Sequence, residues 1–401
     1  ITARPMVLEA LALLGKPAVP TMAGLLTRRD LSLPTRRSIV TALASIEGSA
    51  ARDSLIALAE EPALGPAAMN SLLRMRVAGR IDPIDPATLQ GTMEEEMAKG
   101  LRFSLAASGL RSMAGDNPEA IFVARELESL RARSLHRVLR VLSLSYDTRR
   151  LSPVATALLS KDIARVSNAL ELLEGSISQD TAALVMPFME AAAENFPEWR
   201  TIELVPDAIT ILQNPGETLT NEKDWWPRSL GLHVLGRDDE ISTPGRHKNK
   251  ADDAQEDEAM IPLIEKVMIL KGSELFRNFP GPDLAGIASL AQVVYLEPDE
   301  VLFNQGEEGD AFYMVVQGGV RITRGSTELA ILGTREGFGE MAILDQETRS
   351  ATATAAEATT LLRIGQDSFD QLIEQNPTVA RGIYRVLTER LRNTLAQVAA
   401  G

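Results

Sequence analysis

The spacing of apolar residues predicts paired helices at the beginning of the chain. The stretch VLEALALLGKPAVPTMAGLL, which starts at Val7, aligns with IVTALASIEGSAARDSLIAL, which starts at Ile39, at an offset of 32 residues. Apolar residues recur three and four positions apart in both copies, which is the period of one helix face. Each copy is interrupted by a glycine, Gly15 or Gly48. We therefore expect two helices joined by a turn in each copy, and a third pair beginning in LGPAAMNSLLRM.

A helix pair of this kind cannot bury its apolar face alone, so neighbouring pairs must stack. The stretch LPTRRSIVTALASI resembles the first helix of a HEAT unit, although the offset is shorter than the ~40 residues typical of HEAT repeats. By this resemblance, residues 1–236 form a HEAT-like α-solenoid. Asp162 is the expected N-cap of a later helix. Trp225 and Trp226, near the end of this region, are predicted to pack or cap rather than to stack on a ligand.

Residues 237–258 interrupt the helical pattern. They contain one large apolar residue, Ile241, together with four basic and eight acidic side chains. This composition cannot form a core, and it predicts a charged flexible linker. The RHKNK run inside the segment is not expected to be a binding motif, because acidic residues follow it directly. Residues 259–271 return to helical spacing and predict a connecting helix.

From about Ala291 the pattern changes to that of short strands. The runs QVVYL, EVLFNQ, AFYMVVQ, GVRITRG, TELAILG and ATTLLRI are rich in β-branched or aromatic residues, and glycine-containing turns separate several of them. This spacing predicts a β-roll of the jelly-roll type. Two helices are expected to close the chain, one near Asp367 or Ser368 and one beginning at Pro377. The expected fold class is multidomain α and α+β, with the solenoid followed by a β-roll and flanking helices at 272–401.

One stretch of the predicted β-roll, FGEMAILDQETRSATATA, places an acid and a base nine residues apart. A strand that stops at Gly339 and turns into one helical turn would aim several backbone N–H groups at one point, which forms an anion cradle. Arg349, expected on the next strand, can hold two phosphate oxygens at once. Glu340 suits a hydroxyl beside the phosphate, and a 3′,5′-cyclic nucleotide has both groups. A direct ion pair between Glu340 and Arg349 is the alternative.

This stretch resembles the phosphate-binding cassette of the cyclic-nucleotide-binding domain family, which includes protein kinase A regulatory subunits, cyclic-nucleotide-gated channels and the bacterial catabolite activator. VLFNQGEEGDAFYMVVQGGVRI resembles the glycine-punctuated first half of that domain, and the helix from Pro377 resembles its lid. The resemblance covers about residues 272–398. It implies that Glu340 binds the ribose hydroxyl and Arg349 the cyclic phosphate. The ligand-binding residues that it implies are Gly339, Glu340, Met341, Ala342, Arg349 and Ser350.

The resemblance implies a cyclic nucleotide as the ligand, and it leaves the base open. We expect cAMP, with cGMP as the alternative, because the hydroxyl of Ser350 can serve either purine. No other cofactor is expected.

Composition and charge narrow the classes of function. The chain has 401 residues, no cysteine and a net charge of −14, and residues 272–401 contain 10 basic and 18 acidic side chains. This acidity argues against a nucleic-acid partner. The absence of cysteine excludes thiolate and disulfide chemistry and fits a reducing cytoplasm. The three histidines are isolated in the sequence, so we expect no catalytic residues, no metal site and no enzyme activity.

The expected function is a regulatory module that binds a cyclic nucleotide and relays the change through the solenoid to an attached effector. A HEAT-like region followed by MIPLIEKVMILKGSELFRN and a cyclic-nucleotide domain resembles the part outside the membrane of bacterial transporters similar to ATP/ADP carriers. This resemblance implies an N-terminal membrane transporter domain and a place on the cytoplasmic side of an inner membrane. The chain ends just after the expected lid helix, without the helix-turn-helix of catabolite-activator transcription factors. The alternative is a protein-interaction scaffold whose cyclic-nucleotide-type domain is structural and does not bind.

Overall fold

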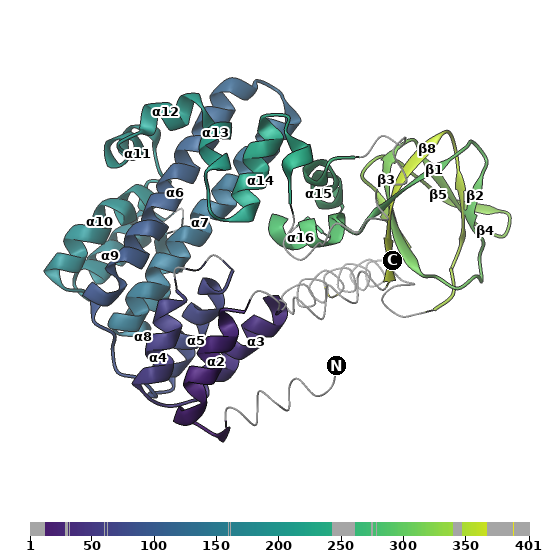
Figure 1. The fold of residues 1–401 in the computed structure, drawn as a ribbon. Helices are drawn as coiled ribbons and strands as arrows, with labels where there is room; N and C mark the ends of the chain where they lie inside the picture. Colours follow the sequence, from purple (N-terminus) through teal and green to yellow (C-terminus); the bar gives the residue numbers. More distant parts are fainter. Residues whose placement is uncertain are drawn as a thin grey trace. The chain divides into compact units, whose positions relative to one another are not determined.

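The chain forms two compact units, Ile1–Leu235 and Gly236–Gly401 (Figure 1). The computed structural model describes residues 13–28, 31, 33–59, 61, 63–158, 160, 162–242, 261–273, 276–277, 279–339, 347–366 and 388. The predicted division of the chain into residues 1–236, 237–258, 259–271 and 272–401 stays a prediction, because most of the expected linker lies outside these ranges.

The described part of the first unit is built from helices alone. Two of the predicted turns, at Gly15 and Gly48, are confirmed, because these glycines have φ angles of 68° and 120° that let the chain reverse between helices. The helices of this unit are η1 (Lys16–Ala18), α2 (Val19–Leu26), α3 (Leu33–Leu43), α4 (Ser49–Ala57), α5 (Gly65–Val77), α6 (Pro86–Ala114), α7 (Pro118–Ser145), α8 (Thr148–Leu158), α9 (Ile163–Glu174), α10 (Gln179–Ala193), α11 (Glu198–Leu204), α12 (Ala208–Gln213), α13 (Pro215–Thr220) and α14 (Trp225–Val234).

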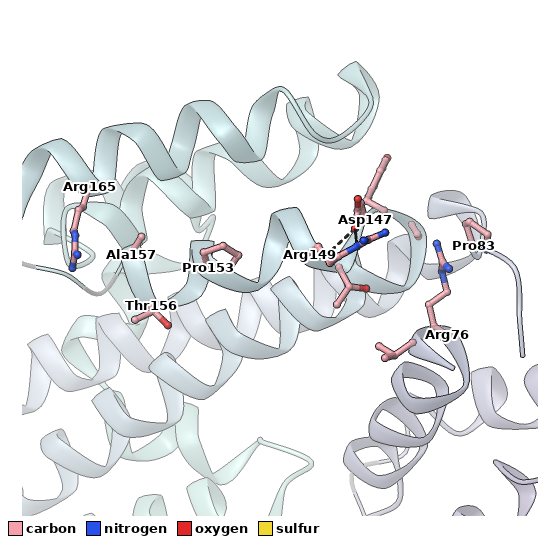
Figure 2. A pocket seen from close by; sticks show the side chains of 12 residues that line it. Arg76, Pro83, Asp147, Arg149, Pro153, Thr156, Ala157 and Arg165 are labelled. Carbon is pink, nitrogen blue, oxygen red and sulfur yellow. Dashed lines mark hydrogen bonds and ion pairs between the residues drawn. The ribbon is translucent and has the colours of Figure 1, made fainter. Parts of the chain in front are cut away.

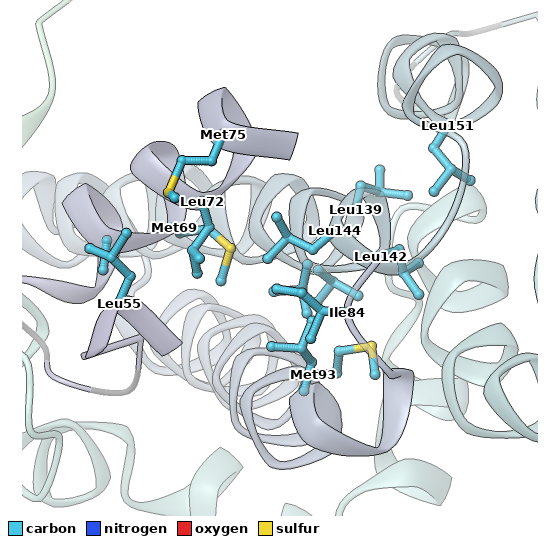
Figure 3. Packing of buried hydrophobic residues seen from close by; sticks show 14 of the residues in the cluster. Leu55, Met69, Leu72, Met75, Ile84, Met93, Leu139, Leu142, Leu144 and Leu151 are labelled. Atoms are coloured by element: carbon cyan, nitrogen blue, oxygen red, sulfur yellow. The ribbon is translucent and has the colours of Figure 1, made fainter. Parts of the chain in front are cut away.

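The long helices α6 and α7 pack side by side and contribute to the core of the first unit. Figure 3 shows side chains from several helices converging there, among them Leu72 of α5, Met93 of α6 and Leu139 of α7. Burying one such side chain contributes about 1.5–3 kcal/mol. Gly109 of α6 lets α12 approach closely, because a Cβ at this position would overlap the carbonyl oxygen of Leu212.

These helices agree with only part of the predicted solenoid. The helix-rich N-terminal region is confirmed, but the helices range from six residues in α12 to 29 in α6. Aligned positions of the first two copies also differ in burial, since Ile46 is 2% exposed and Leu14 is 65% exposed. The HEAT-like solenoid therefore stays a prediction.

Two local predictions for the first unit are confirmed. Asp162 caps α9, because its Oδ1 accepts hydrogen bonds from the backbone N–H groups of Ala164 and Arg165 at 3.0 and 3.3 Å. Trp226 is 2% exposed, and its ring packs edge-on against that of Trp225 with centroids 5.5 Å apart. These tryptophans therefore belong to the packing of the helical unit.

The second unit contains the predicted strands. All six strand-like runs of the sequence form strands, and two shorter strands, β6 and β7, are added. The closing helices expected near Asp367 or Ser368 and from Pro377 lie outside the described residues. The elements of this unit are η2 (Asp238–Glu240), α15 (Leu263–Gly272), α16 (Gly281–Ala288), β1 (Gln292–Leu296), β2 (Val301–Phe303), β3 (Ala311–Gln317), β4 (Val320–Arg324), β5 (Thr327–Leu332), β6 (Gly337–Phe338), β7 (Thr352–Ala355) and β8 (Thr359–Gly365).

These strands form two four-stranded sheets, ordered β1-β8-β3-β6 and β2-β7-β4-β5, in which all neighbouring strands are antiparallel. Buried side chains from both sheets share one core, with Val315 and Leu361 from the first sheet and Val320 and Ala353 from the second. Side chains alternate along a strand, so each sheet contributes one face to this core. The antiparallel sheets agree with the jelly-roll that the sequence predicts.

Among the described residues, no helix combines the length and the apolar character needed to cross a membrane. In the same part of the chain, no group of three or more His, Asp or Glu side chains is placed to hold a metal ion.

The cap of α9 gives a test of this fold. We expect Asp162→Ala to destabilise the helical unit by about 1 kcal/mol, because two backbone N–H groups lose their acceptor. The measurement is the thermal unfolding midpoint followed by circular dichroism at the helix band. Asp82→Ala, which removes an exposed acid outside the helices, is the control. Equal losses in the two variants would contradict the capping role.

Candidate functional site

The candidate site lies where β6 ends and where the chain approaches β7. Gly339 directly follows β6, and Arg349 precedes β7, which begins at Thr352. Of the predicted site residues, the structure describes Gly339, Arg349 and Ser350. The other three predicted residues, Glu340, Met341 and Ala342, lie outside the described residues.

The prediction that Arg349 lies on the next strand is wrong. Arg349 is in an irregular segment, because its backbone pairs with a loop rather than with a strand ladder. Its N–H donates to the carbonyl oxygen of Glu307 at 2.7 Å, and its own carbonyl accepts from the N–H of Gly306 at 2.8 Å. An isolated bridge between Glu308 and Thr348 extends this pairing. The loop before β3 therefore holds Arg349 in place.

Gly339 and Arg349 are brought into contact, as the predicted site requires. An Nη1 hydrogen of Arg349 points to the carbonyl oxygen of Gly339, with 3.5 Å between the heavy atoms. Gly339 has a φ of 80°, and a Cβ at this position would lie 2.6 Å from Nη1 of Arg349. Two features therefore require glycine at position 339, namely the positive φ and the close approach of the Arg349 guanidinium.

Two aromatic rings line the guanidinium of Arg349. Its central carbon lies 4.1 Å from the ring centroid of Phe303 and 5.6 Å from that of Tyr313. A guanidinium over an aromatic face is attracted by the ring quadrupole, and this attraction grows when water is removed. Arg349 is only 5% exposed, and within the described part of the chain its buried Nε has no hydrogen-bond partner. The rings therefore fix its orientation without using its hydrogen-bonding capacity.

The charge of Arg349 is only partly compensated. Its Nη2 lies 3.9 Å from Oδ1 of Asp310, whereas Oδ2 of the same carboxylate accepts a 2.6 Å hydrogen bond from Arg363. Burial lowers the pKa of Arg349, although Tyr313 and Asp310 act in the opposite direction. A buried cation without a close anion is electrostatically costly, and an incoming anion would relieve that cost.

The loop before β3, which holds Arg349 through its backbone, is itself ordered by Glu307. The Glu307 carboxylate accepts hydrogen bonds from the backbone N–H of Asn304 at 3.0 Å and from its side-chain amide at 2.8 Å. These two bonds lower the pKa of Glu307, and the nearby charge of Arg349 adds to the effect. The ionised form of Glu307 is therefore the one that closes this turn.

Ser350 lies at the edge of the site. It is exposed, and its backbone carbonyl accepts a hydrogen bond from Nε of Arg324 at 3.2 Å. This bond involves the backbone of Ser350 and not its hydroxyl. The contact of that hydroxyl with a nucleotide base therefore stays a prediction.

The sequence analysis did not identify three residues that set the environment of Arg349, namely Phe303, Tyr313 and Asp310. One signal was available for Asp310, which follows Gly309 directly before a predicted strand, in a turn typical of binding loops. The two aromatic residues gave no signal, because aromatic residues in predicted strands are usually part of the core.

Comparison with known proteins agrees with this location. Residues 293–376 match the family model described as Cyclic nucleotide-binding domain. The Cyclic AMP receptor protein of Thermus thermophilus is 38% identical over 128 residues, which are 31% of this chain and 59% of that protein. The cGMP-dependent protein kinase of Eimeria tenella is 34% identical over 87 residues, which are 22% of this chain and 9% of the kinase.

Among solved structures, the N-terminal domain of a transcriptional regulator from Streptomyces coelicolor A3(2) is 30% identical, with a TM-score of 0.31. That match covers 32% of this chain and 94% of the other. The chain spans less than two thirds of the length of the curated relatives named above. The C-terminal region thus contains a cyclic nucleotide-binding domain, and this part of the expectation is confirmed. The HEAT-like and transporter resemblances stay predictions.

The contact between Gly339 and Arg349 can be tested by adding one methyl group. We expect Gly339→Ala to destabilise the C-terminal unit by about 1–3 kcal/mol, because a Cβ combines an unfavourable φ with a clash against the guanidinium. Chemical denaturation followed by tyrosine fluorescence measures the loss. Gly325→Ala is the matched control, since Gly325 has a φ of 58° but no atom within 4 Å of an added Cβ. If both variants lose the same stability, the clash with Arg349 is absent.

Proposed function

We propose that the C-terminal unit binds a 3′,5′-cyclic nucleotide, with cAMP as the favoured ligand and cGMP as the alternative. One observation carries this proposal: Arg349 is 5% exposed, and the carboxylate beside it among the described residues, that of Asp310, is 3.9 Å away. A cyclic phosphate carries one negative charge and two free oxygens that match the guanidinium fork. Its binding would place an anion beside a cation whose nearest carboxylate among the described residues is 3.9 Å away.

The family match supports the choice of ligand class, since residues 293–376 include both Gly339 and Arg349. The two relatives are named for different nucleotides, one for cyclic AMP and one for cGMP. We place cAMP first because the cyclic AMP receptor protein matches at higher identity, 38% against 34%, and over a longer segment, 128 against 87 residues.

The remaining residues of the site are assigned by the pattern of the family. We assign Glu340 to the free 2′-hydroxyl of the ribose, because a carboxylate accepts a hydrogen bond from a hydroxyl. Met341, Ala342 and Ser350 are assigned to the wall around the phosphate. A direct ion pair between Glu340 and Arg349 is the competing arrangement, and it would neutralise the cation without any ligand.

We further propose that binding works as a switch and starts no reaction, so we assign no catalytic residue, metal or additional cofactor. A ligand shifts a protein between two states only if it binds one of them more tightly. Here the phosphate would favour the state in which the backbone N–H groups after Gly339 and the guanidinium of Arg349 both point to the bound phosphate. A shift of Arg349 would move the loop that is hydrogen-bonded to it through Gly306 and Glu307.

The output of the switch is proposed to reach an effector through the helical unit, which we interpret as a HEAT-like solenoid. The effector that fits the domain order is a membrane transporter joined to the N-terminal side, with this chain on the cytoplasmic face. No nucleic-acid partner is proposed, because the chain has a net charge of −14. The competing function is a protein-interaction scaffold with a structural domain that binds no nucleotide.

Titration calorimetry of the full chain with cAMP and cGMP tests the binding. We expect cAMP to bind with a Kd below about 100 μM. Arg349→Ala should cost about 1.5–3 kcal/mol of binding free energy, the scale of a hydrogen bond to a charged group. Arg321→Ala is the matched control, since this arginine of β4 pairs with exposed Asp299 and Glu328 instead. Failure of both nucleotides to bind would favour the scaffold, and normal binding by Arg349→Ala would make this arginine a structural residue.

Hydrogen–deuterium exchange of the full chain tests the relay separately. We expect saturating cAMP to change amide exchange within Ile1–Leu235 as well as in the C-terminal unit, because a relayed switch alters the local stability of the elements it passes through. The same addition to Arg349→Ala should change neither unit. Changes confined to Gly236–Gly401 would show that the ligand is bound but that no signal reaches the helices.

A further inference from the structure

A groove of about 1380 Å³ lies in the helical unit and shares no residue with the nucleotide site. Its walls come mainly from the end of α5, from the end of α7 and the turn after it, from α8 along its length and from the start of α9. Figure 2 shows Arg165 and Arg76 at opposite ends of a row of lining residues, with Pro153 and Thr156 between them. The residues that line the groove are Arg76, Val77, Pro83, Ser145, Tyr146, Asp147, Thr148, Arg149, Pro153, Thr156, Ala157 and Arg165.

The lining of this groove is positively charged although the protein is acidic. It contains Arg76, Arg149 and Arg165 and a single acid, Asp147, whereas the whole chain has a net charge of −14. The side chains of Arg149 and Arg165 are 95% and 74% exposed. Both therefore present their charges to a molecule in solution.

The carboxylates beside these arginines already accept hydrogen bonds from backbone N–H groups at the starts of α8 and α9. Oδ1 of Asp147 accepts a 2.9 Å hydrogen bond from the backbone N–H of Arg149 and lies 3.8 Å from the Nε of its side chain. Asp162, 4.0 Å from the guanidinium of Arg165, caps α9. Among the described residues, Nε of Arg76 is buried without a hydrogen-bond partner. The lining thus retains a net positive charge, because it contains three arginines and one acid.

An apolar pocket adjoins the charged groove. This pocket, of about 500 Å³, shares Val77 and Thr148 with the groove, and its apolar lining includes Leu73, Leu139 and Leu151. Val77 is 71% exposed, which leaves an apolar side chain at the junction of the two hollows. The combined surface can therefore hold an apolar side chain next to a row of acidic ones.

We propose that this surface binds an acidic peptide segment of a partner protein, with an apolar side chain of that segment seated beside Val77. The charge pattern is complementary to carboxylates, and complementary potentials give specificity and fast association. The arginines are spread along the groove rather than gathered at one point, which fits an extended chain better than a single small anion. A nucleic acid is disfavoured, because its dense phosphates would be repelled by the rest of this acidic chain.

Fluorescence anisotropy with the full chain tests this inference. The probe is a labelled peptide of three Glu-Leu-Asp-Ser repeats, and we expect a Kd below about 100 μM at low ionic strength that weakens as salt is added. Arg149→Glu combined with Arg165→Glu should weaken binding at least about tenfold, because repulsion replaces attraction at two exposed positions. Circular dichroism of the same samples checks that the helices are intact. Arg125→Glu, an exposed arginine of α7 outside the groove, should leave binding unchanged.

Three comparisons separate this binding from other kinds. A peptide with serine in place of leucine should bind at least about fivefold more weakly, and equal binding would overturn the role of the apolar pocket. A single-stranded DNA oligonucleotide should not displace the peptide, and full displacement would overturn the preference for a peptide. Absence of peptide binding, or equal binding by the charge-reversed variant, would overturn the proposal as a whole.

Discussion

The burial of one guanidinium, that of Arg349, is the constraint on which the candidate site depends. Removing this cation from water is costly, and among the described residues aromatic rings and a carbonyl oxygen offset part of that cost. The face of Phe303 comes from β2, the face of Tyr313 from β3, and the carbonyl oxygen of Gly339 follows β6. These strands belong to both sheets, so the environment of Arg349 exists only when the two sheets pack together.

Another buried cation of this protein, Lys99, has carboxylate groups close to its charge. Lys99 is 7% exposed and lies 3.7 Å from a carboxylate oxygen of Glu96 and 3.6 Å from one of Asp224. Its charge is thereby neutralised within the helical unit, as expected for a structural ion pair. Among the described residues, the carboxylate near Arg349 is that of Asp310, and this carboxylate is engaged chiefly by Arg363. The contrast between two buried cations in one chain supports the interpretation that Arg349 is held ready for an anion.

Local patterns in the sequence account for much of the fold. Strand runs alternate or carry β-branched residues, and helix ends carry polar caps such as Asp162, so both can be read from neighbouring residues. The sequence also indicated Gly339 and Arg349 as residues of one phosphate site, because their residue types suit a phosphate at that spacing, but their direct contact was not predicted. The irregular backbone at Arg349 was not predictable, since it depends on hydrogen bonds with Gly306 and Glu307, which are far away in the sequence. The sequence also does not determine how the helices stack, because the 32-residue repeat is recognisable only in its first copies.

The sequence by itself determined the helix-rich N-terminal region, the six longer runs that form strands, the acidic balance of the chain and the residues that point to a cyclic nucleotide. Only the tertiary structure decided which side chains surround Arg349, and that Arg76, Arg149 and Arg165 line one groove. The physical reason is the range over which each property acts. Periodicity and capping are set by residues within a turn or two, whereas burial and charge compensation depend on segments that meet only when helices and sheets pack.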